Sequence, residues 1–174
     1  KDGESMHEAV QRESKAARDS AGILDASTLG KIDIQGTDAS EFLNRVYTNA
    51  WSKLAIGKCR YGLMLNEDGM VYDDGVTTRL DENHYIMTTT TGGAATVLGK
   101  LEDYLQTEWP ELDVYLTSVT DHYATVSVCG PNSKKIVSQV IPDLDFSDEN
   151  FPHMSFKNAK IGKINCRVMR ISFT

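Results

Sequence analysis

The chain has only three cysteines, Cys59, Cys129 and Cys166, and they lie far apart. An odd number of widely spaced cysteines does not make the framework of a small disulfide-stapled domain. The sequence also has no Cys-x-x-Cys pair and no closely spaced histidine pair, so it predicts no zinc site. We therefore expect ordinary reduced thiols, no bound metal and a cytoplasmic protein.

Basic residues and long apolar runs are also scarce. The chain carries 18 Lys and Arg against 25 Asp and Glu, a net charge of −7, whereas a nucleic-acid-binding protein needs a basic face that displaces counterions. No apolar run approaches the ~20 residues needed to span a bilayer, and the first residues contain no signal-peptide core. We expect neither a nucleic-acid partner nor a membrane span.

The common signatures of nucleophilic and nucleotide-dependent enzymes are missing as well. There is no Gly-x-Ser-x-Gly, no Gly-x-x-x-x-Gly-Lys and no Gly-x-Gly-x-x-Gly after a strand. The Gly92-Gly93 pair is best interpreted as a break between a strand and a helix. The length of 174 residues allows one domain with a real core, or two small lobes. Because the chain starts without Met and ends within a strand-like pattern, we expect it to be a piece of a longer polypeptide.

The first third of the sequence predicts two helices and a strand. Apolar residues recur at helical spacing over 6–19, and Gly22 follows as a plausible stop. Residues 30–36 alternate apolar and polar side chains, as in a half-buried strand. Asp38 and Glu41 have the spacing of a capping box at the start of the next helix.

The rest of the chain predicts hairpins with helices inserted between them. An Asn-Glu-Asp-Gly turn at 66–69 joins two strands, and a second turn follows at 81–84. Strands are expected at 63–65, 70–80, 85–91, 114–116, 123–128 and 166–173, and further helices over 97–105 and from Ser133 to about Pro142. This order predicts an α+β fold with largely antiparallel sheets.

Asp73 and Asp74 are unexpected inside a predicted strand, because Asp is disfavoured there. Successive strand residues point to opposite faces, so one carboxylate can face solvent while the other faces the core or a cleft. A carboxylate held in a cleft is placed to bind an amine or to accept a proton. The alternative is an edge strand whose solvated acids prevent aggregation. The residues alone leave both interpretations open.

Four segments resemble the folate-binding domain of glycine-cleavage aminomethyltransferases. Residues 60–74 resemble the family's Y-x-x-x-L-N-x-x-G-x-x-x-D-D hairpin, and residues 22–31 resemble its opening D-x-S segment. Residues 130–133 are similar to its G-P-x-(A/S) motif, and residues 170–174 to the lead-in to its T-G-E motif. The resemblance implies that residues 1–174 form the N-terminal part of an aminomethyltransferase-like folate-binding domain, with a truncated version of that fold.

Within this superfamily, the sequence is more similar to the α chain of heterotetrameric sarcosine oxidases than to the glycine-cleavage enzymes. The similar segments are 6–10, 24–36, 46–51 and 88–93. The resemblance implies a tetrahydrofolate-binding domain that captures the imine from sarcosine oxidation as 5,10-methylenetetrahydrofolate and releases glycine. It also implies that FMN, FAD and NAD are bound by other parts of the complete complex, that the other oxidase subunits are partners, and that this piece alone is inactive.

The same resemblance assigns site residues. Asp74 matches the family's key aspartate beside the reactive folate nitrogens, and Tyr61 matches its folate-lining tyrosine. Leu29 falls where relatives place an apolar residue against the pterin, with a plain core leucine as the alternative. Thr89 and Thr90 fall where glycine-cleavage enzymes carry a pterin-binding Asn, which this chain lacks.

Two other functions remain open at this point. One is a glycine-cleavage aminomethyltransferase, which would depend on a lipoyl carrier protein in place of a flavin subunit. The other is a non-catalytic scaffold module of the same superfamily. Asp73-Asp74 and Tyr61 favour a working folate site over the scaffold.

Overall fold

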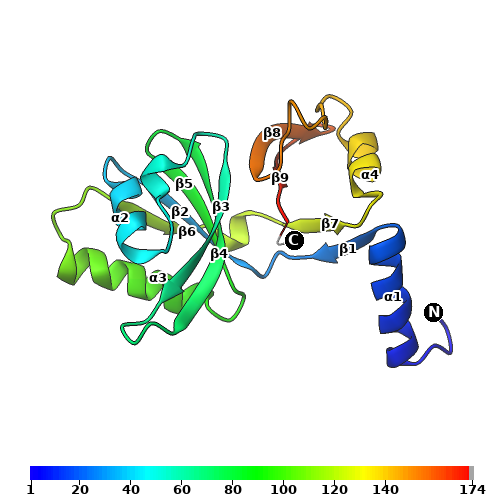
Figure 1. The fold of residues 1–174 in the computed structure, drawn as a ribbon, viewed down its shortest axis with the longest axis horizontal. Coiled ribbons are helices and arrows are strands. Elements are labelled where there is room, and N and C mark those ends of the chain that lie inside the picture. Colours follow the sequence, from blue (N-terminus) through cyan, green and yellow to red (C-terminus); the bar gives the residue numbers. More distant parts are fainter. Residues whose placement is uncertain (173–174) are drawn as a thin grey trace.

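A five-stranded antiparallel sheet forms the larger of two lobes in the computed structural model, which describes residues 1–172 (Figure 1). The strand order is β3-β4-β5-β2-β6. The strands are β2 (Gly30–Gln35), β3 (Cys59–Leu65), β4 (Val71–Asp81), β5 (His84–Thr89) and β6 (Tyr115–Ser118). The sheet is thus built mainly from the hairpins that the turn residues predict, and the α+β, largely antiparallel prediction is confirmed.

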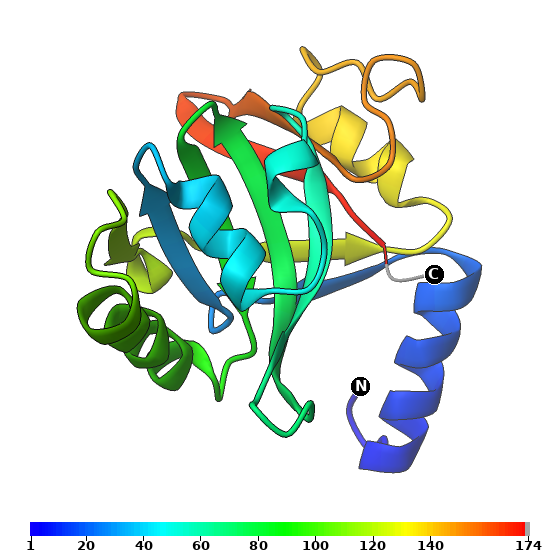
Figure 2. The same ribbon diagram turned by 60° about the vertical axis from the view of Figure 1, so that its left-hand side comes forward.

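Two helices cover one face of this sheet, which we call the helix face (Figure 2). They are α2 (Ala39–Val46) and α3 (Ala94–Asp103), supplemented by a 3₁₀ turn at Trp51–Lys53 and a π-helical turn at Tyr104–Glu108. The main core lies between them and the alternate strand residues that point towards them. Its largest fully buried side chains are Trp51, Tyr85, Phe42, Ile32, Ile34, Leu43, Met64, Met87, Leu101 and Val97.

The second lobe is smaller and contains two separate two-stranded ladders. Its elements are α1 (Met6–Asp19), β1 (Gly22–Asp25), the 3₁₀ turn Thr120–His122, β7 (Val126–Cys129), α4 (Ser133–Val140), β8 (Ser155–Ile161) and β9 (Ile164–Arg170). β1 pairs with β7, and β8 pairs with β9. Phe156 of β8 and Met169 of β9 pack with Cys59 and Val76, so this hairpin covers part of the sheet face opposite the helices. That opposite face is where the two lobes meet.

Helix α1 stands at the far end of the second lobe and buries none of its residues (Figure 1). Its start is fixed by a capping box in which Ser5 and Glu8 each satisfy the other's backbone N–H. The predicted helix over 6–19 is confirmed, but it ends at Asp19 and is capped by Ser20. Gly22 is the first residue of β1 instead of a helix stop.

Other local predictions differ from the structure. The strand expected over 85–91 ends at Thr89, and the strand expected over 123–128 begins at Val126. The capping box of Asp38 and Glu41 is wrong, because the Asp38 side chain makes no cap bond and accepts the N–H of Asp113 at 2.9 Å. The last strand begins earlier than expected, at Ile164, and pairs with β8, which the sequence pattern missed. This strand ends at Arg170, before the expected end at Phe173, because Ile171 and Ser172 are not part of it. Phe173, and Thr174 before the T-G-E motif, lie outside the described residues.

None of the helices among residues 1–172 is both long enough and apolar enough to cross a membrane.

Candidate functional site

The two adjacent aspartates lie in a central strand. At Asp73 and Asp74, β4 is paired with β3, whereas its pairing with β5 covers Thr77 to Asp81. Asp73 is buried, so the two residues are not a pair of solvated acids that protect a strand edge. Met64 lies opposite Asp73, and Leu63 lies opposite Asp74. Because opposed residues share a face, Asp73 points to the helix face with buried Met64, while Asp74 points to the opposite face.

Asp73 is a structural residue of the helix face. It is only 4% exposed, and it accepts the Thr90 hydroxyl at 2.6 Å and the Thr90 N–H at 3.3 Å. The Thr90 hydroxyl in turn accepts the Gly93 N–H at 3.1 Å. This chain of bonds ties β4 to the loop that leads into α3. A buried carboxylate that accepts two hydrogen bonds is a stable arrangement, and the Asp73 oxygens are therefore engaged within the fold.

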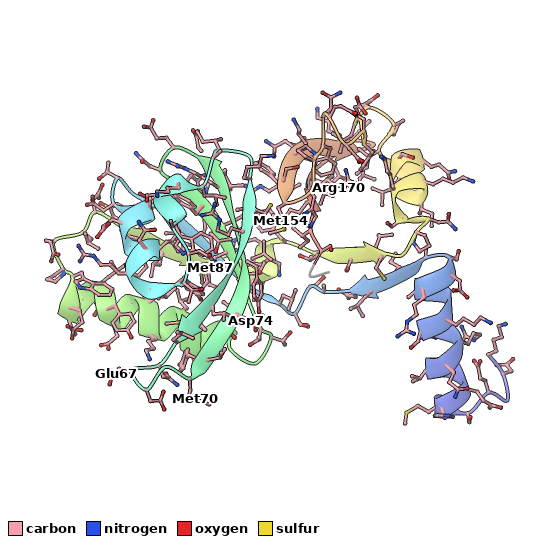
Figure 3. The ribbon with its side chains drawn as sticks, in the orientation of Figure 1. Glu67, Met70, Asp74, Met87, Met154 and Arg170 are labelled. Carbon is pink, nitrogen blue, oxygen red and sulfur yellow. The ribbon has the colours of Figure 1, made fainter. Side chains whose placement is uncertain are left out.

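Asp74 is partly exposed on the opposite face and is bound to a tyrosine. The Tyr61 hydroxyl on β3 donates to Asp74 Oδ2 at 2.8 Å, and Tyr61 is 36% exposed. Figure 3 shows Asp74 farther along the hairpin than the turn marked by Glu67 and Met70. The exposed aromatic ring can pack against a flat, nitrogen-rich ligand. The partly exposed carboxylate beside it can accept a proton from that ligand.

The hydrogen bond gives Tyr61 a measurable signature. Donation to Asp74 stabilises the neutral phenol and raises the pKa of Tyr61 above its ordinary value of 10.0. The stabilisation is therefore fully present below the ordinary pKa and is lost as the pH rises through the raised one. We expect Asp74→Asn to lower the pKa of Tyr61 towards its ordinary value. The difference in ultraviolet absorbance between each protein and its Tyr61→Phe variant isolates this phenol, and an unchanged midpoint would contradict the pairing.

The segment before β3 holds the Tyr61 backbone in place, a contact that the sequence did not predict. Asn49 has a φ of 89°, and its side-chain amide donates to the Tyr61 carbonyl at 2.7 Å. The Thr48 N–H donates to the Leu63 carbonyl, and the Thr48 hydroxyl accepts the Leu63 N–H. These bonds cover the outer edge of β3. A non-glycine residue at positive φ is uncommon and gathers at functional sites, and Asn tolerates it best.

Replacing Asn49 separates its backbone role from its side-chain role. Asn49→Gly loses the amide but accepts the positive φ, whereas Asn49→Ala loses both. We expect the alanine variant to be less stable than the glycine variant by about 1 kcal/mol. Scanning calorimetry of the complete protein measures the difference. Equal stability of the two variants would show that the left-handed backbone is not strained by a side chain.

The other predicted site residues make their hydrogen bonds elsewhere. The Thr89 hydroxyl is buried on the helix face and donates to the Thr90 carbonyl at 2.9 Å, while the Thr90 hydroxyl is bound to Asp73. Leu29 is partly buried in the connection between β1 and β2. Among the five predicted residues, the structure brings Tyr61 and Asp74 into direct contact. Within residues 1–172 no group of three His, Cys, Asp or Glu side chains is placed to hold a metal.

Comparison with known proteins identifies a family for the whole chain. Residues 2–174 match the GCVT N-terminal domain. The sarcosine oxidase subunit alpha of Corynebacterium sp. (strain U-96) is 58% identical over 174 residues, which are 99% of this chain and 18% of that subunit. The chain therefore spans about a fifth of this relative's length.

More distant matches are an aminomethyltransferase sequence and a solved structure with a similar fold. The aminomethyltransferase of Exiguobacterium sibiricum is 28% identical over 169 residues, covering 97% of this chain and 45% of that protein. The crystal structure of glycine cleavage system aminomethyltransferase T from Bartonella henselae superposes with a TM-score of 0.79 at 23% identity, over 95% of this chain and 42% of that chain. The resemblance on which the sequence interpretation rests is thereby confirmed.

Proposed function

Since this chain belongs to the GCVT N-terminal domain family, we propose that it is the tetrahydrofolate-binding domain of a sarcosine oxidase α chain. The observation that carries the proposal is the contact between Tyr61 and Asp74 on the open part of the sheet face. Both residues match the family's folate motif, and the order of the matched segments runs through the chain. The identity of 58% to a sarcosine oxidase subunit alpha supports this branch.

The residues around Asp74 fit a reduced pterin. The Tyr61 ring offers a partly exposed apolar wall, and Leu63, opposite Asp74 on the same face, adds a second apolar surface. The Asp74 carboxylate provides acceptor oxygens for the N–H groups of a pterin. We place Leu29 at the edge of the same pocket, as the resemblance implies, and leave Thr89 and Thr90 out of it because their hydroxyls are engaged on the helix side.

In the proposed reaction, sarcosine would lose two electrons and a proton from its N-methyl group on another subunit, where a flavin would serve as the oxidant, and the product would be an iminium. The one-carbon unit passes to the two folate nitrogens, glycine leaves with its amine, and 5,10-methylenetetrahydrofolate is the product. Asp74 accepts the proton that an attacking nitrogen loses, and its negative charge stabilises the cationic carbon centre. Tyr61 holds the carboxylate in position by its hydrogen bond.

The wider assignments follow the same proposal. The partners are the other subunits of a heterotetrameric oxidase, which would bind FMN, FAD and NAD outside this domain, in the cytoplasm. Recognition of the anionic folate tail has to be local, because the chain itself carries a net charge of −7.

The two alternatives are weaker. A glycine-cleavage aminomethyltransferase is disfavoured by identity, since the aminomethyltransferase relative named above is 28% identical against 58% for the oxidase subunit. A non-catalytic scaffold is disfavoured by the intact Tyr61–Asp74 pair.

The experiment is a product analysis of the complete polypeptide assembled with its flavin-bearing subunits. Sarcosine is supplied with and without tetrahydrofolate, and free formaldehyde and methylenetetrahydrofolate are measured. We expect formaldehyde without folate and methylenetetrahydrofolate with it. Formaldehyde release that is unaffected by folate would contradict the proposal, and a requirement for a lipoyl carrier protein would favour the aminomethyltransferase.

A further inference from the structure

Lys31 is a buried cation that the proposed reaction does not use. It is the second residue of β2, and only 4% of it is exposed. Burying an ammonium is costly unless its N–H groups are bound. Here all three have backbone acceptors, namely the carbonyls of Ser27 at 2.9 Å, Leu29 at 2.9 Å and Thr120 at 3.2 Å. Desolvation lowers the pKa of Lys31, and the charges of Asp121 and Asp25 act in the opposite direction.

The three acceptors belong to two different connections between the lobes. The first connection, residues 26–29, leads from β1 to β2, and the second, residues 119–125, leads from β6 to β7. Figures 1 and 2 show both connections running between the sheet and the second lobe. Ser27 and Leu29 lie on the first connection and Thr120 on the second. The Lys31 ammonium therefore bonds to both connections at once.

Further bonds join the same two connections. The Lys31 N–H donates to the Thr120 hydroxyl at 3.1 Å, and the Val119 N–H donates to the Lys31 carbonyl at 2.8 Å. At the other end, the Thr125 N–H donates to the Ser27 hydroxyl at 3.0 Å. Two of these three bonds are accepted by side-chain hydroxyls and one joins two backbone groups, whereas the Lys31 ammonium supplies the charged donor at this junction. Hydrogen bonds from a charged donor are the stronger kind.

We propose that Lys31 is a positioning residue that clasps the two inter-lobe connections together and so fixes Leu29 at the edge of the folate pocket. The Leu29 carbonyl is held directly by the ammonium, and the Leu29 N–H is held by the Ala26 carbonyl at 3.1 Å. The backbone of Leu29 therefore has little freedom to move, and this fixes the position from which its side chain projects. This inference rests on the proposed function for its consequence, but the clasp itself is a property of the chain alone.

The test replaces Lys31 with Met, which keeps much of the side-chain length and removes the charge and the donors. Lys53→Met, at an exposed lysine of the 3₁₀ turn Trp51–Lys53, is the matched control. In the complete assembly, hydrogen–deuterium exchange of peptides spanning 26–31 and 119–125 should rise on the order of tenfold in Lys31→Met, because a loosened junction opens more often. The KM for tetrahydrofolate should rise about tenfold, equivalent to a loss of about 1.4 kcal/mol in binding, with turnover at saturating folate unchanged.

The outcomes separate this inference from the proposed function. Unchanged exchange in Lys31→Met would overturn the clasp whatever happens to folate. Faster exchange with an unchanged KM would overturn the positioning of Leu29, and a fall in turnover at saturating folate would also overturn it. A wild-type assembly that does not bind tetrahydrofolate would contradict the proposed function, while the exchange result would still decide on the clasp. If Lys31→Met does not accumulate folded, Lys31→Gln, which keeps N–H donors but loses the charge and one of the three donor bonds, should shift both readouts in the same direction.

Discussion

In Asp74→Asn, we expect the complete oxidase to go on consuming sarcosine and to release the carbon as free formaldehyde. The carboxylate on the open sheet face is the proposed proton acceptor, and its charge is the proposed stabiliser of the cationic carbon. An amide of the same size offers the Tyr61 hydroxyl a weaker, neutral acceptor and loses both functions. General-base groups contribute roughly 10²–10⁴-fold, so methylenetetrahydrofolate formation should fall by about 10²-fold or more.

The measurement is the ratio of methylenetetrahydrofolate to formaldehyde per sarcosine consumed. Asp103→Asn on the exposed surface of α3 makes the same chemical change away from the site and should leave the ratio at the wild-type value. A wild-type product ratio in Asp74→Asn would contradict the role assigned to this carboxylate.

The neighbouring acid should behave in the opposite way. Asp73→Ala removes a buried carboxylate and leaves the Thr90 hydroxyl and N–H without their acceptor. Losing a buried charged partner of this kind should destabilise the sheet lobe by about 3 kcal/mol. Asp74→Ala, at a partly exposed position, should cost less than about 1 kcal/mol.

Native-state hydrogen exchange in the complete protein measures both variants. Peptides from β4, from β5 and from the loop before α3 should lose protection in Asp73→Ala and keep it in Asp74→Ala. Thr90→Val, which removes one donor to Asp73, should lie between the two. If Asp73→Ala and Asp74→Ala were equally stable, the division between a structural and a functional aspartate would be wrong.

The sequence predicted the hairpin that carries the site, because its turn residues and alternation are local signals. It left the direction of the two aspartates open, since alternation says only that Asp73 and Asp74 face opposite ways. The register between β3 and β4 decides which aspartate faces the helices. Met64 lies opposite Asp73, and a bulge between Met64 and Leu65 shifts the pairing of the residues nearer the turn. A register is a relation between two strands, so it is not written in either strand alone.

Long-range contacts account for the local errors. Asp38 has the spacing of a cap, yet its carboxylate binds the N–H of Asp113, 75 residues along the chain. β8 was missed because it is exposed along much of its length and reads as a polar segment, and it becomes a strand by pairing with β9.

The positioning residues were beyond sequence reasoning for a similar reason. Lys31 stands in an alternating segment and reads as a solvated lysine, but the fold surrounds its ammonium with carbonyls from two connections. Asn49 gave one usable signal, since Asn is tolerated at positive φ, but its bond to the Tyr61 carbonyl depends on how the segment meets β3.

Tyr61 and Asp74 form part of the proposed tetrahydrofolate site, and direct binding of tetrahydrofolate is the property that depends on them most immediately. Calorimetric titration of the complete protein with tetrahydrofolate measures this without any reaction. We predict one site per chain. Tyr61→Phe should lower the affinity for tetrahydrofolate on the order of tenfold, because it removes the hydroxyl that binds Asp74. Asp74→Asn should lower it at least as much, because it removes the charged acceptor beside the ligand. A complete protein that binds no tetrahydrofolate, or binds it equally well in both variants, would contradict the account.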